Sequence, residues 1–81
     1  MLYPNPATDK ITISLYNEKY SKAKITVYDI AGRKVLPTID VTNSQNRFTK
    51  TIDIVQIKPG IYLIEAIMDN KEKVTSKFIK Q

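Results

Sequence analysis

The chain has 81 residues, enough for one small hydrophobic core. Its 42% apolar residues are typical of a folded protein, and none of its apolar runs is long enough for a transmembrane helix. Cysteine and histidine are both absent, which excludes disulfides, thiolate and imidazole metal ligands, and the commonest general base. The net charge of +5 could attract phosphates or acidic surfaces, although a lysine-rich solvated surface explains it more simply.

Apolar and polar residues alternate in short runs, and no run repeats its apolar residues at helical spacing over three turns. Pro37 restricts the run that contains it to the edge of a sheet, since proline donates no ladder hydrogen bond. The run that begins at Ile61 is at first apolar on both faces, as in a central strand. The alternation predicts short strands over residues 2–6, 11–15, 24–28, 34–41, 47–54, 61–68 and 74–79.

Turn-forming residues separate these runs. The pair Asp69-Asn70 predicts a tight turn that joins the last two strands as an antiparallel hairpin, because both residue types tolerate left-handed backbone geometry. In the fifth run Phe48, Ile52 and Ile54 should face inward, whereas Lys50 interrupts this face and leaves the register open. Six or seven short strands spaced by about ten residues predict an all-β fold, a sandwich of two sheets.

Prolines and glycines mark points where the backbone is constrained. Pro4 and Pro6 fix two φ angles and remove two donors. Asp9 follows at a position where its carboxylate can accept a backbone N–H and close a turn. Gly32 and Gly60 lie in turn signals, and we expect each to hold a positive φ angle.

The sequence predicts structural roles for Asp29 and Tyr62, which lie near these glycines. Asp29 can accept a hydrogen bond from an amide of the Gly32 turn. Tyr62 should pack its ring in the core with its hydroxyl at the rim. A lone glycine turn says little about function, so neither residue predicts a site by itself.

The reactive side chains form no catalytic pattern. The carboxylates are scattered singly, and the one Ser-x-x-Lys spacing, Ser21 to Lys24, lacks a partner motif. There is neither a phosphate-binding glycine loop nor an aspartate-rich calcium loop. Tyr28 and Phe48 alone lie on predicted strands among basic residues, which is weak support for a nucleic-acid platform. We therefore predict a domain that is not an enzyme and has no metal, cofactor or nucleic acid partner.

Four short motifs follow one another along the chain: Tyr3-Pro4-Asn5-Pro6 with Asp9, Val27-x-Asp29 with Gly32-x-x-Val35, Gly60-Ile61-Tyr62, and Lys77-x-x-Lys80. Each motif alone is weak, but the ordered set closely resembles the C-terminal sorting domain, type A, of the type IX (Por) secretion system. The resemblance covers nearly the whole chain, from Leu2 to Gln81.

The resemblance implies an immunoglobulin-like β-sandwich of about seven short antiparallel strands, with residues 1–81 as one sorting domain of a longer exported protein. Its expected partners are an N-terminal cargo in cis, the type IX translocon with its shuttle components, and a sortase-like cysteine peptidase that removes the domain. The expected route is through the periplasm to the medium or the cell surface, without direct membrane insertion. By position, the residues expected to be recognised by the translocon are those of the tail: Lys77, Phe78, Ile79, Lys80 and Gln81.

A different class of function fits the same composition: a fibronectin-like or immunoglobulin-like spacer, or a carbohydrate-binding accessory module, of a secreted protein. The two hypotheses differ over the tail. If the tail is a sorting signal, deleting residues 77–81 should abolish export while the sandwich still folds. If the chain is a spacer, the same deletion should change little, since charged residues at a strand end serve only to discourage edge pairing.

Overall fold

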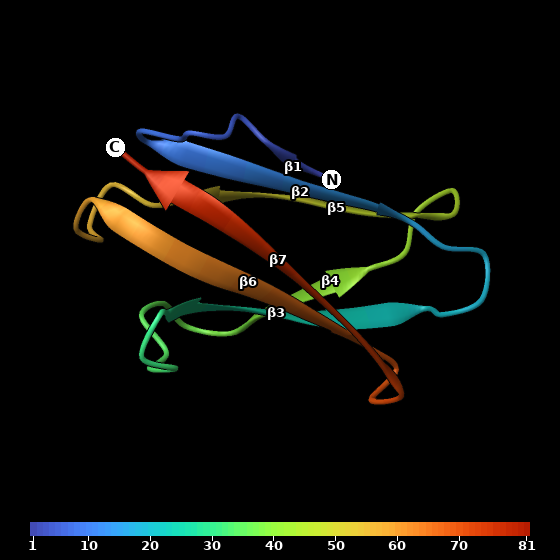
Figure 1. Cartoon of the computed structure of the whole chain (residues 1–81). Coiled ribbons are helices and arrows are strands. Elements are labelled where there is room, and N and C mark those ends of the chain that lie inside the picture. Colours follow the sequence, from blue (N-terminus) through green and yellow to red (C-terminus); the bar gives the residue numbers. More distant parts are fainter.

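The computed structural model describes all 81 residues and consists of strands and connecting loops without a helix (Figure 1). The seven strands, in chain order, are β1 (Leu2–Tyr3), β2 (Lys10–Tyr16), β3 (Lys22–Asp29), β4 (Ile39–Thr42), β5 (Arg47–Asp53), β6 (Gly60–Met68) and β7 (Glu72–Lys80). All strand pairs are antiparallel. The predicted all-β sandwich is thus confirmed.

The strands form two sheets that pack face to face. One sheet has the order β1-β2-β5 and the other the order β4-β3-β6-β7. The fourth strand pairs with the third, whereas in a constant-type immunoglobulin domain it belongs to the sheet of the fifth. Figure 1 shows that β7 crosses toward the three-stranded sheet, so that its C-terminal end lies beside the start of β2.

The core lies between the sheets and is built from the inward positions of alternating strands. In β2, Ile11 and Ile13 are buried, and in β3 the buried positions include Ile25 and Val27. Thr26, on the opposite face of β3, is the one buried polar residue, and its hydroxyl lies 3.1 Å from that of Thr38. The largest fully buried side chains are Phe48, Phe78, Ile11, Ile25, Ile54, Ile64, Met68 and Val27.

The hairpin of β6 and β7 follows the sequence prediction closely. Asp69 and Asn70 have φ angles of 50° and 57°, and the Lys71 N–H donates to the Met68 carbonyl at 2.9 Å. The strands then pair without interruption from Met68–Glu72 to Gly60–Lys80. As predicted, β6 is central, with β3 on its other side. The Asp69 carboxylate also accepts the backbone N–H groups of Ser21 and Lys22, which fixes this turn against the start of β3.

Two predicted strands are shorter than expected. Pairing of the fourth begins only at Ile39, and Lys34 makes a single bridge to Tyr28. The intervening Leu36 is buried as a loop residue, so its apolar character reflects core packing and not a strand. Pro37 cannot donate to a ladder, which is consistent with a strand that starts after it. At the N-terminus only Leu2 and Tyr3 pair with β2.

The register of β5 is uninterrupted despite Lys50. Phe48, Ile52 and Ile54 are buried as predicted. Lys50 pairs with the buried Ile13 of β2, so it occupies an inward-facing position, yet its side chain is exposed at the margin of the sandwich. The lysine thus interrupts the apolar face without shifting the pairing.

Candidate functional site

The tail residues predicted to be recognised do not share one environment. Phe78 is completely buried, whereas Ile79 is 44% exposed and Lys77 is exposed on the other face of β7. Lys80 is partly buried and Gln81, beyond the strand, is exposed. The side chains that a partner can contact on the folded domain are therefore those of Lys77, Ile79 and Gln81, with part of Lys80. Phe78 is not accessible to a partner and contributes by packing in the core.

Phe78 anchors the tail through Tyr62, its cross-strand neighbour on β6. The two rings stack with centroids 5.7 Å apart and planes inclined by 26°. The Tyr62 hydroxyl donates to the Lys58 carbonyl oxygen, four residues upstream. A tyrosine near the start of the sixth strand that bonds back to the preceding backbone is the tyrosine corner of immunoglobulin-like sandwiches. This is the core-and-rim placement predicted for Tyr62.

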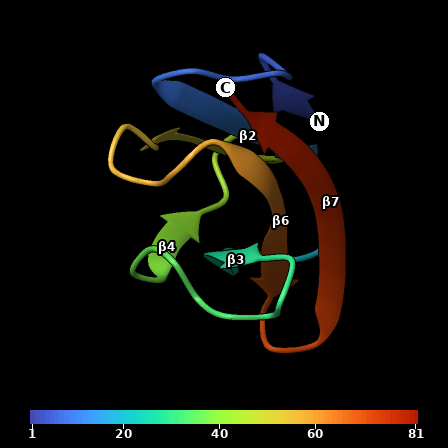
Figure 2. The same ribbon diagram turned by 60° about the vertical axis from the view of Figure 1, so that its left-hand side comes forward.

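The N-terminal motif lies against the tail, a placement that the strand pattern did not predict. The Asn5 side-chain amide accepts the Ile79 N–H at 3.0 Å and donates to the Lys77 carbonyl at 3.4 Å, in place of a neighbouring peptide group. The Ala7 N–H donates to the Ile79 carbonyl at 2.8 Å, and the Ala7 carbonyl accepts the Gln81 N–H at 2.7 Å. We call residues 5–7 the latch. It pairs in parallel with the end of β7 and so bridges the two sheets (Figure 2).

The remaining residues of the N-terminal segment make no side-chain hydrogen bond. Pro4 and Pro6 are exposed on either side of Asn5, while Ala7 is completely buried. The expectation for Asp9 was wrong: its carboxylate makes no hydrogen bond, and its main-chain carbonyl instead accepts the Ile54 N–H at 2.8 Å. That bond joins the latch region to the end of β5, so Asp9 is placed by sheet geometry and not by a side-chain turn.

The Gly32 turn has the geometry that the sequence predicted. Gly32 has a φ of 85°, and Asp29 Oδ1 accepts the backbone N–H groups of Ala31 and Arg33 at 3.0 and 2.9 Å. Arg33 Nε adds a contact of 2.9 Å to Asp29 Oδ2. The Arg33 backbone N–H, followed by its guanidinium, holds the pKa of the Asp29 carboxyl below its usual range. Val35 follows as a partly buried residue packed on the core.

Gly60 differs from Gly32. Its φ is 159°, and it is already the first residue of β6, paired with Lys80. The expectation of a positive φ at Gly60 is confirmed, but at the start of a strand and not inside a turn.

Motif residues that are far apart in the sequence form one row across the four-stranded sheet. Asp29 of β3 is paired with Tyr62 of β6, and Tyr62 with Phe78 of β7. Val35 and Lys58 join Asp29 and Tyr62 around an open depression of about 360 Å³. The row ends at the tail, so the turn, the tyrosine corner and the tail together form one structural unit.

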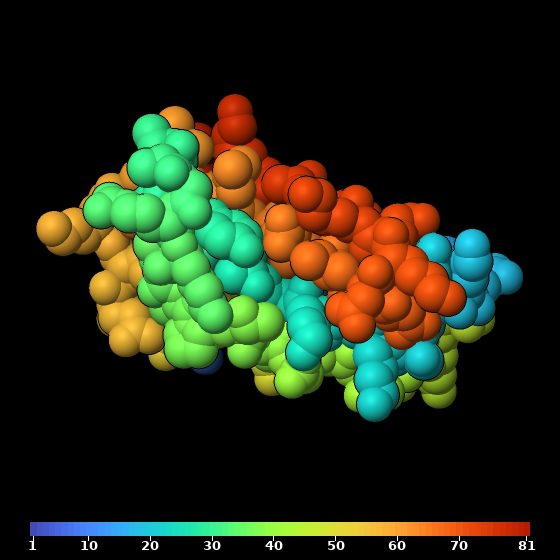
Figure 3. Space-filling view, turned by 90° about the horizontal axis from the view of Figure 1, so that it is seen from below, coloured from blue at the N-terminus to red at the C-terminus, as the bar shows by residue number.

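The outer face of the same sheet carries an exposed apolar patch beside this unit. Ile61 and Ile79 are cross-strand neighbours and are 46% and 44% exposed. The next pair along the strands is Leu63, half-buried, with Lys77. In Figure 3 this face shows β3, β6 and β7 as adjacent stripes, with β7 at the border of the molecule. Ile61 and Leu63 were not predicted as site residues, although the apolar character of both faces of their strand was the available signal.

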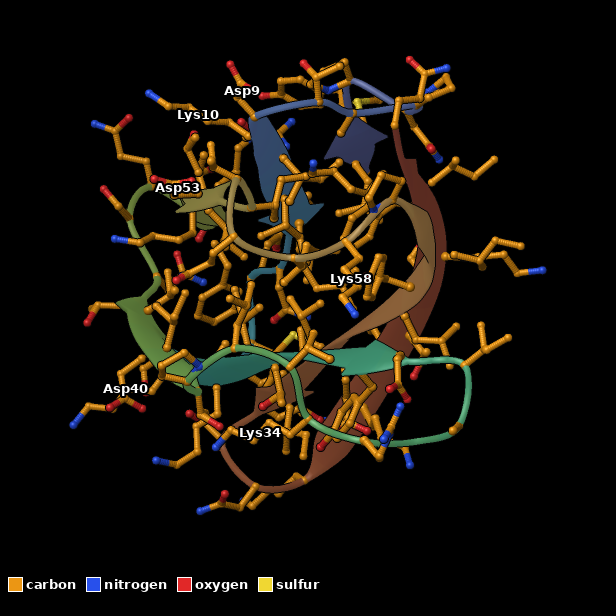
Figure 4. The ribbon with its side chains drawn as sticks, turned by 90° about the vertical axis from the view of Figure 1, so that its left-hand side faces the viewer. Asp9, Lys10, Lys34, Asp40, Asp53 and Lys58 are labelled. Atoms are coloured by element: carbon orange, nitrogen blue, oxygen red, sulfur yellow. The ribbon has the colours of Figure 1, made fainter.

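Charged side chains are spread around the rim of the sandwich (Figure 4). Asp9, Lys10 and Asp53 lie along the three-stranded sheet, where Lys10 and Asp53 are register partners. Lys34 and Asp40 lie along the other sheet. No three carboxylates are grouped so that they could hold a metal ion. The structure also has no helix with the length and apolarity needed to cross a membrane.

Comparison with known proteins defines the class to which this arrangement belongs. The model of the secretion system C-terminal sorting domain matches residues 1–81, the whole chain. An endo-acting ulvan lyase of Formosa agariphila is 30% identical over 84 residues, which cover 96% of this chain and 14% of the lyase. The chain thus spans about 14% of the length of that relative.

The chain belongs to the family of secretion system C-terminal sorting domains. It is a C-terminal sorting signal for type IX secretion, a route that takes proteins across the outer membrane to the medium or the cell surface. The family is a sorting signal and is not catalytic, in agreement with the sequence prediction. This membership decides against the spacer and the carbohydrate-binding module.

Proposed function

We propose that the chain is a type A sorting domain that forms the C-terminal part of a larger exported protein, with the cargo attached before Leu2. The cargo passes through the periplasm. Shuttle components and the translocon recognise the domain, and a sortase-like cysteine peptidase then removes it. The ordered motifs from Pro4 to Lys80 support the type A assignment, and the ulvan lyase supplies the parallel of a large enzyme with such a segment.

The observation that carries the proposal is the outer face of β6 and β7. We propose that Lys77 and Ile79 are read there together with Ile61, because these side chains are exposed and adjacent across the strands. Exposed apolar patches rimmed by charge are common features of protein–protein contact sites. Phe78 and the tyrosine corner hold this face in place from below, and Lys80 and Gln81 complete the tail where the latch binds.

The experiment is export of a reporter that carries the whole domain at its C-terminus in a bacterium with a type IX system. The double variant Lys77→Ala with Ile79→Ala changes two exposed side chains and leaves Phe78 and the latch bonds, which use the main chain, in place. We expect the reporter to accumulate in the periplasm, with about a tenfold loss from the medium and the cell surface. Cell fractionation measures the distribution.

Ile30→Ala with Val55→Ala is the matched control, since these residues are 73% and 61% exposed and lie outside the patch. The control should be exported like the parent. Unchanged export of the Lys77→Ala, Ile79→Ala variant, in a domain shown to be folded, would remove the outer face of β6 and β7 from the recognition surface.

A further inference from the structure

The outer edge of β7 is covered over only part of its length. The latch occupies the main-chain groups of Ile79, the Lys77 carbonyl and the Gln81 N–H. Main-chain groups alternate in direction along an antiparallel strand, so those of Lys73 and Thr75 also point away from β6. No hydrogen bond reaches them from elsewhere in the chain. In Figure 2 this half of β7 forms the border of the molecule.

The other sheet edges are short or guarded. β1 has two residues, and β4 has four that follow Pro37. β5 is longer but places Lys50 at an inward-facing position, a device that discourages another strand from pairing there. β7 has nine residues in an unbroken register with β6, without proline, glycine or bulge. It is therefore the longest edge strand with free main-chain donors and acceptors to which a further strand can bind.

The chain itself already pairs with this edge further along. Ala7 adds a parallel bridge at Lys80, and the Asn5 amide imitates a peptide group beside Lys77 and Ile79. The covered half shows that the edge of β7 accepts an extended segment without distortion of the β6–β7 ladder. The open half presents the same kind of donors and acceptors with no occupant.

The side chains beside the open half of β7 determine which side chains an added strand should carry. A strand added there has its alternate side chains opposite Lys73 and Lys77 on the outer face. Lys77 makes no ion pair, and Lys73 makes only a long one, 3.9 Å, to Glu65. The intervening side chains would lie opposite Ser76 and the half-buried Val74. Acidic residues alternating with apolar ones complement both rows.

We infer that the open half of β7, from Lys73 to the N–H of Lys77, is a strand-addition site for an extended segment of a partner protein in which acidic and apolar residues alternate. Main-chain bonds to Lys73 and Thr75 supply the affinity, and the lysines select for acidic side chains. The inference concerns the edge of the strand and goes beyond the face proposed above for recognition during export. It does not depend on which protein reads that face.

The test uses the isotope-labelled domain and an alternating glutamate–valine hexapeptide, titrated to millimolar concentration and followed by amide NMR. We expect saturable shifts centred on Lys73 and Thr75, with slowed hydrogen exchange at the Thr75 amide. A lysine–valine hexapeptide should bind roughly fivefold more weakly or worse. If neither amide responds to the glutamate peptide, or both peptides bind equally, the inference is wrong.

Two variants separate strand addition from adhesion to a basic surface. Thr75→Pro removes an N–H that points away from β6, so it should abolish peptide binding while the β6–β7 amides stay protected. Thr75→Val keeps the N–H and should bind like the parent. Lys73→Glu, which adds no backbone change, should remove the preference for the glutamate peptide, because Lys77 is then the one basic side chain left beside the peptide. Binding that survives Thr75→Pro, or self-association through the same amides without peptide, would overturn the proposal.

Discussion

The backbone conformation at Gly32 limits which residues can replace it. Its φ of 85° is in the left-handed region, yet a Cβ there would meet no heavy atom within 4 Å. The cost of a side chain is therefore backbone strain and not a clash. We expect Gly32→Ala to lower the free energy of unfolding by about 1–2 kcal/mol, measured by chemical denaturation.

Gly60→Ala is the matched comparison. Its φ of 159° is also one that L side chains rarely adopt, and a Cβ would approach the Tyr62 ring at an ordinary 3.9 Å. We expect a similar loss, about 1–2 kcal/mol, because backbone strain and not a clash sets it at both positions. An unchanged free energy of unfolding in either variant would show that the backbone at that glycine is ordinary.

Asp29 and Asp69 predict how stability depends on pH. Backbone N–H donors, from Arg33 to Asp29 and from Lys22 and Ser21 to Asp69, hold the pKa of each carboxyl below its usual range. Each ionised group thus contributes stability that is complete above about pH 5 and is lost as the pH falls toward the lowered pKa of the folded state. We expect the melting temperature to decline between roughly pH 5 and pH 2.

Asn replacements test the assignment. Asp29→Asn and Asp69→Asn should each flatten this decline and lower the melting temperature at neutral pH. Asp9→Asn serves as the control, because the Asp9 carboxylate makes no hydrogen bond. An unchanged slope in both Asp29→Asn and Asp69→Asn would show that other carboxylates govern acid unfolding.

At the scale of elements, the latch and β7 form one unit. Asn5→Ala removes two hydrogen bonds to the end of β7, and we expect a loss of about 1–2 kcal/mol together with faster exchange of the Ile79 amide. The Thr75 amide, already open, should not change. Thr8→Ala alters an exposed neighbour without a side-chain hydrogen bond and serves as control. If Ile79 exchange stays slow in Asn5→Ala, the Ala7 bonds alone hold the tail.

The strands could be predicted from the sequence where a periodic pattern or a turn pair marks them. Ile11 and Ile13, or Asp69-Asn70 with its positive φ angles, follow local rules. The latch could not be predicted in this way, because one side-chain amide and the single bridge at Ala7 leave no period. Its partners also lie more than 70 residues away in the sequence.

The candidate site was predicted at the level of the segment and not of the side chain. Alternation shows that Phe78 and Ile79 face opposite ways, but it does not show which one is inside. Burial against Tyr62 decides this, and it depends on how β7 crosses the sandwich. Leu36 presents the reverse case, since it looks like part of a strand and is a buried loop residue.

For the whole molecule, the buried Phe78 changes what truncation of the tail can show. The sequence suggested that a domain without residues 77–81 still folds. Deletion removes a completely buried ring and every partner of the latch. Loss of a buried phenylalanine costs about 3–5 kcal/mol, comparable to the few kcal/mol that hold together a domain of this size. We expect the truncated domain to be largely unfolded at 37 °C, as judged by far-ultraviolet circular dichroism and thermal melting.

The surface variant Lys77→Ala with Ile79→Ala should melt within a few degrees of the parent, since both side chains are exposed. Failed export of the truncated form would then follow from unfolding, whereas failed export of the surface variant reports recognition. Residues 77–81 thus have two roles that deletion cannot separate. A truncated domain that keeps a cooperative melting transition near that of the parent would contradict this, because it would mean that Phe78 and the latch contribute little to stability.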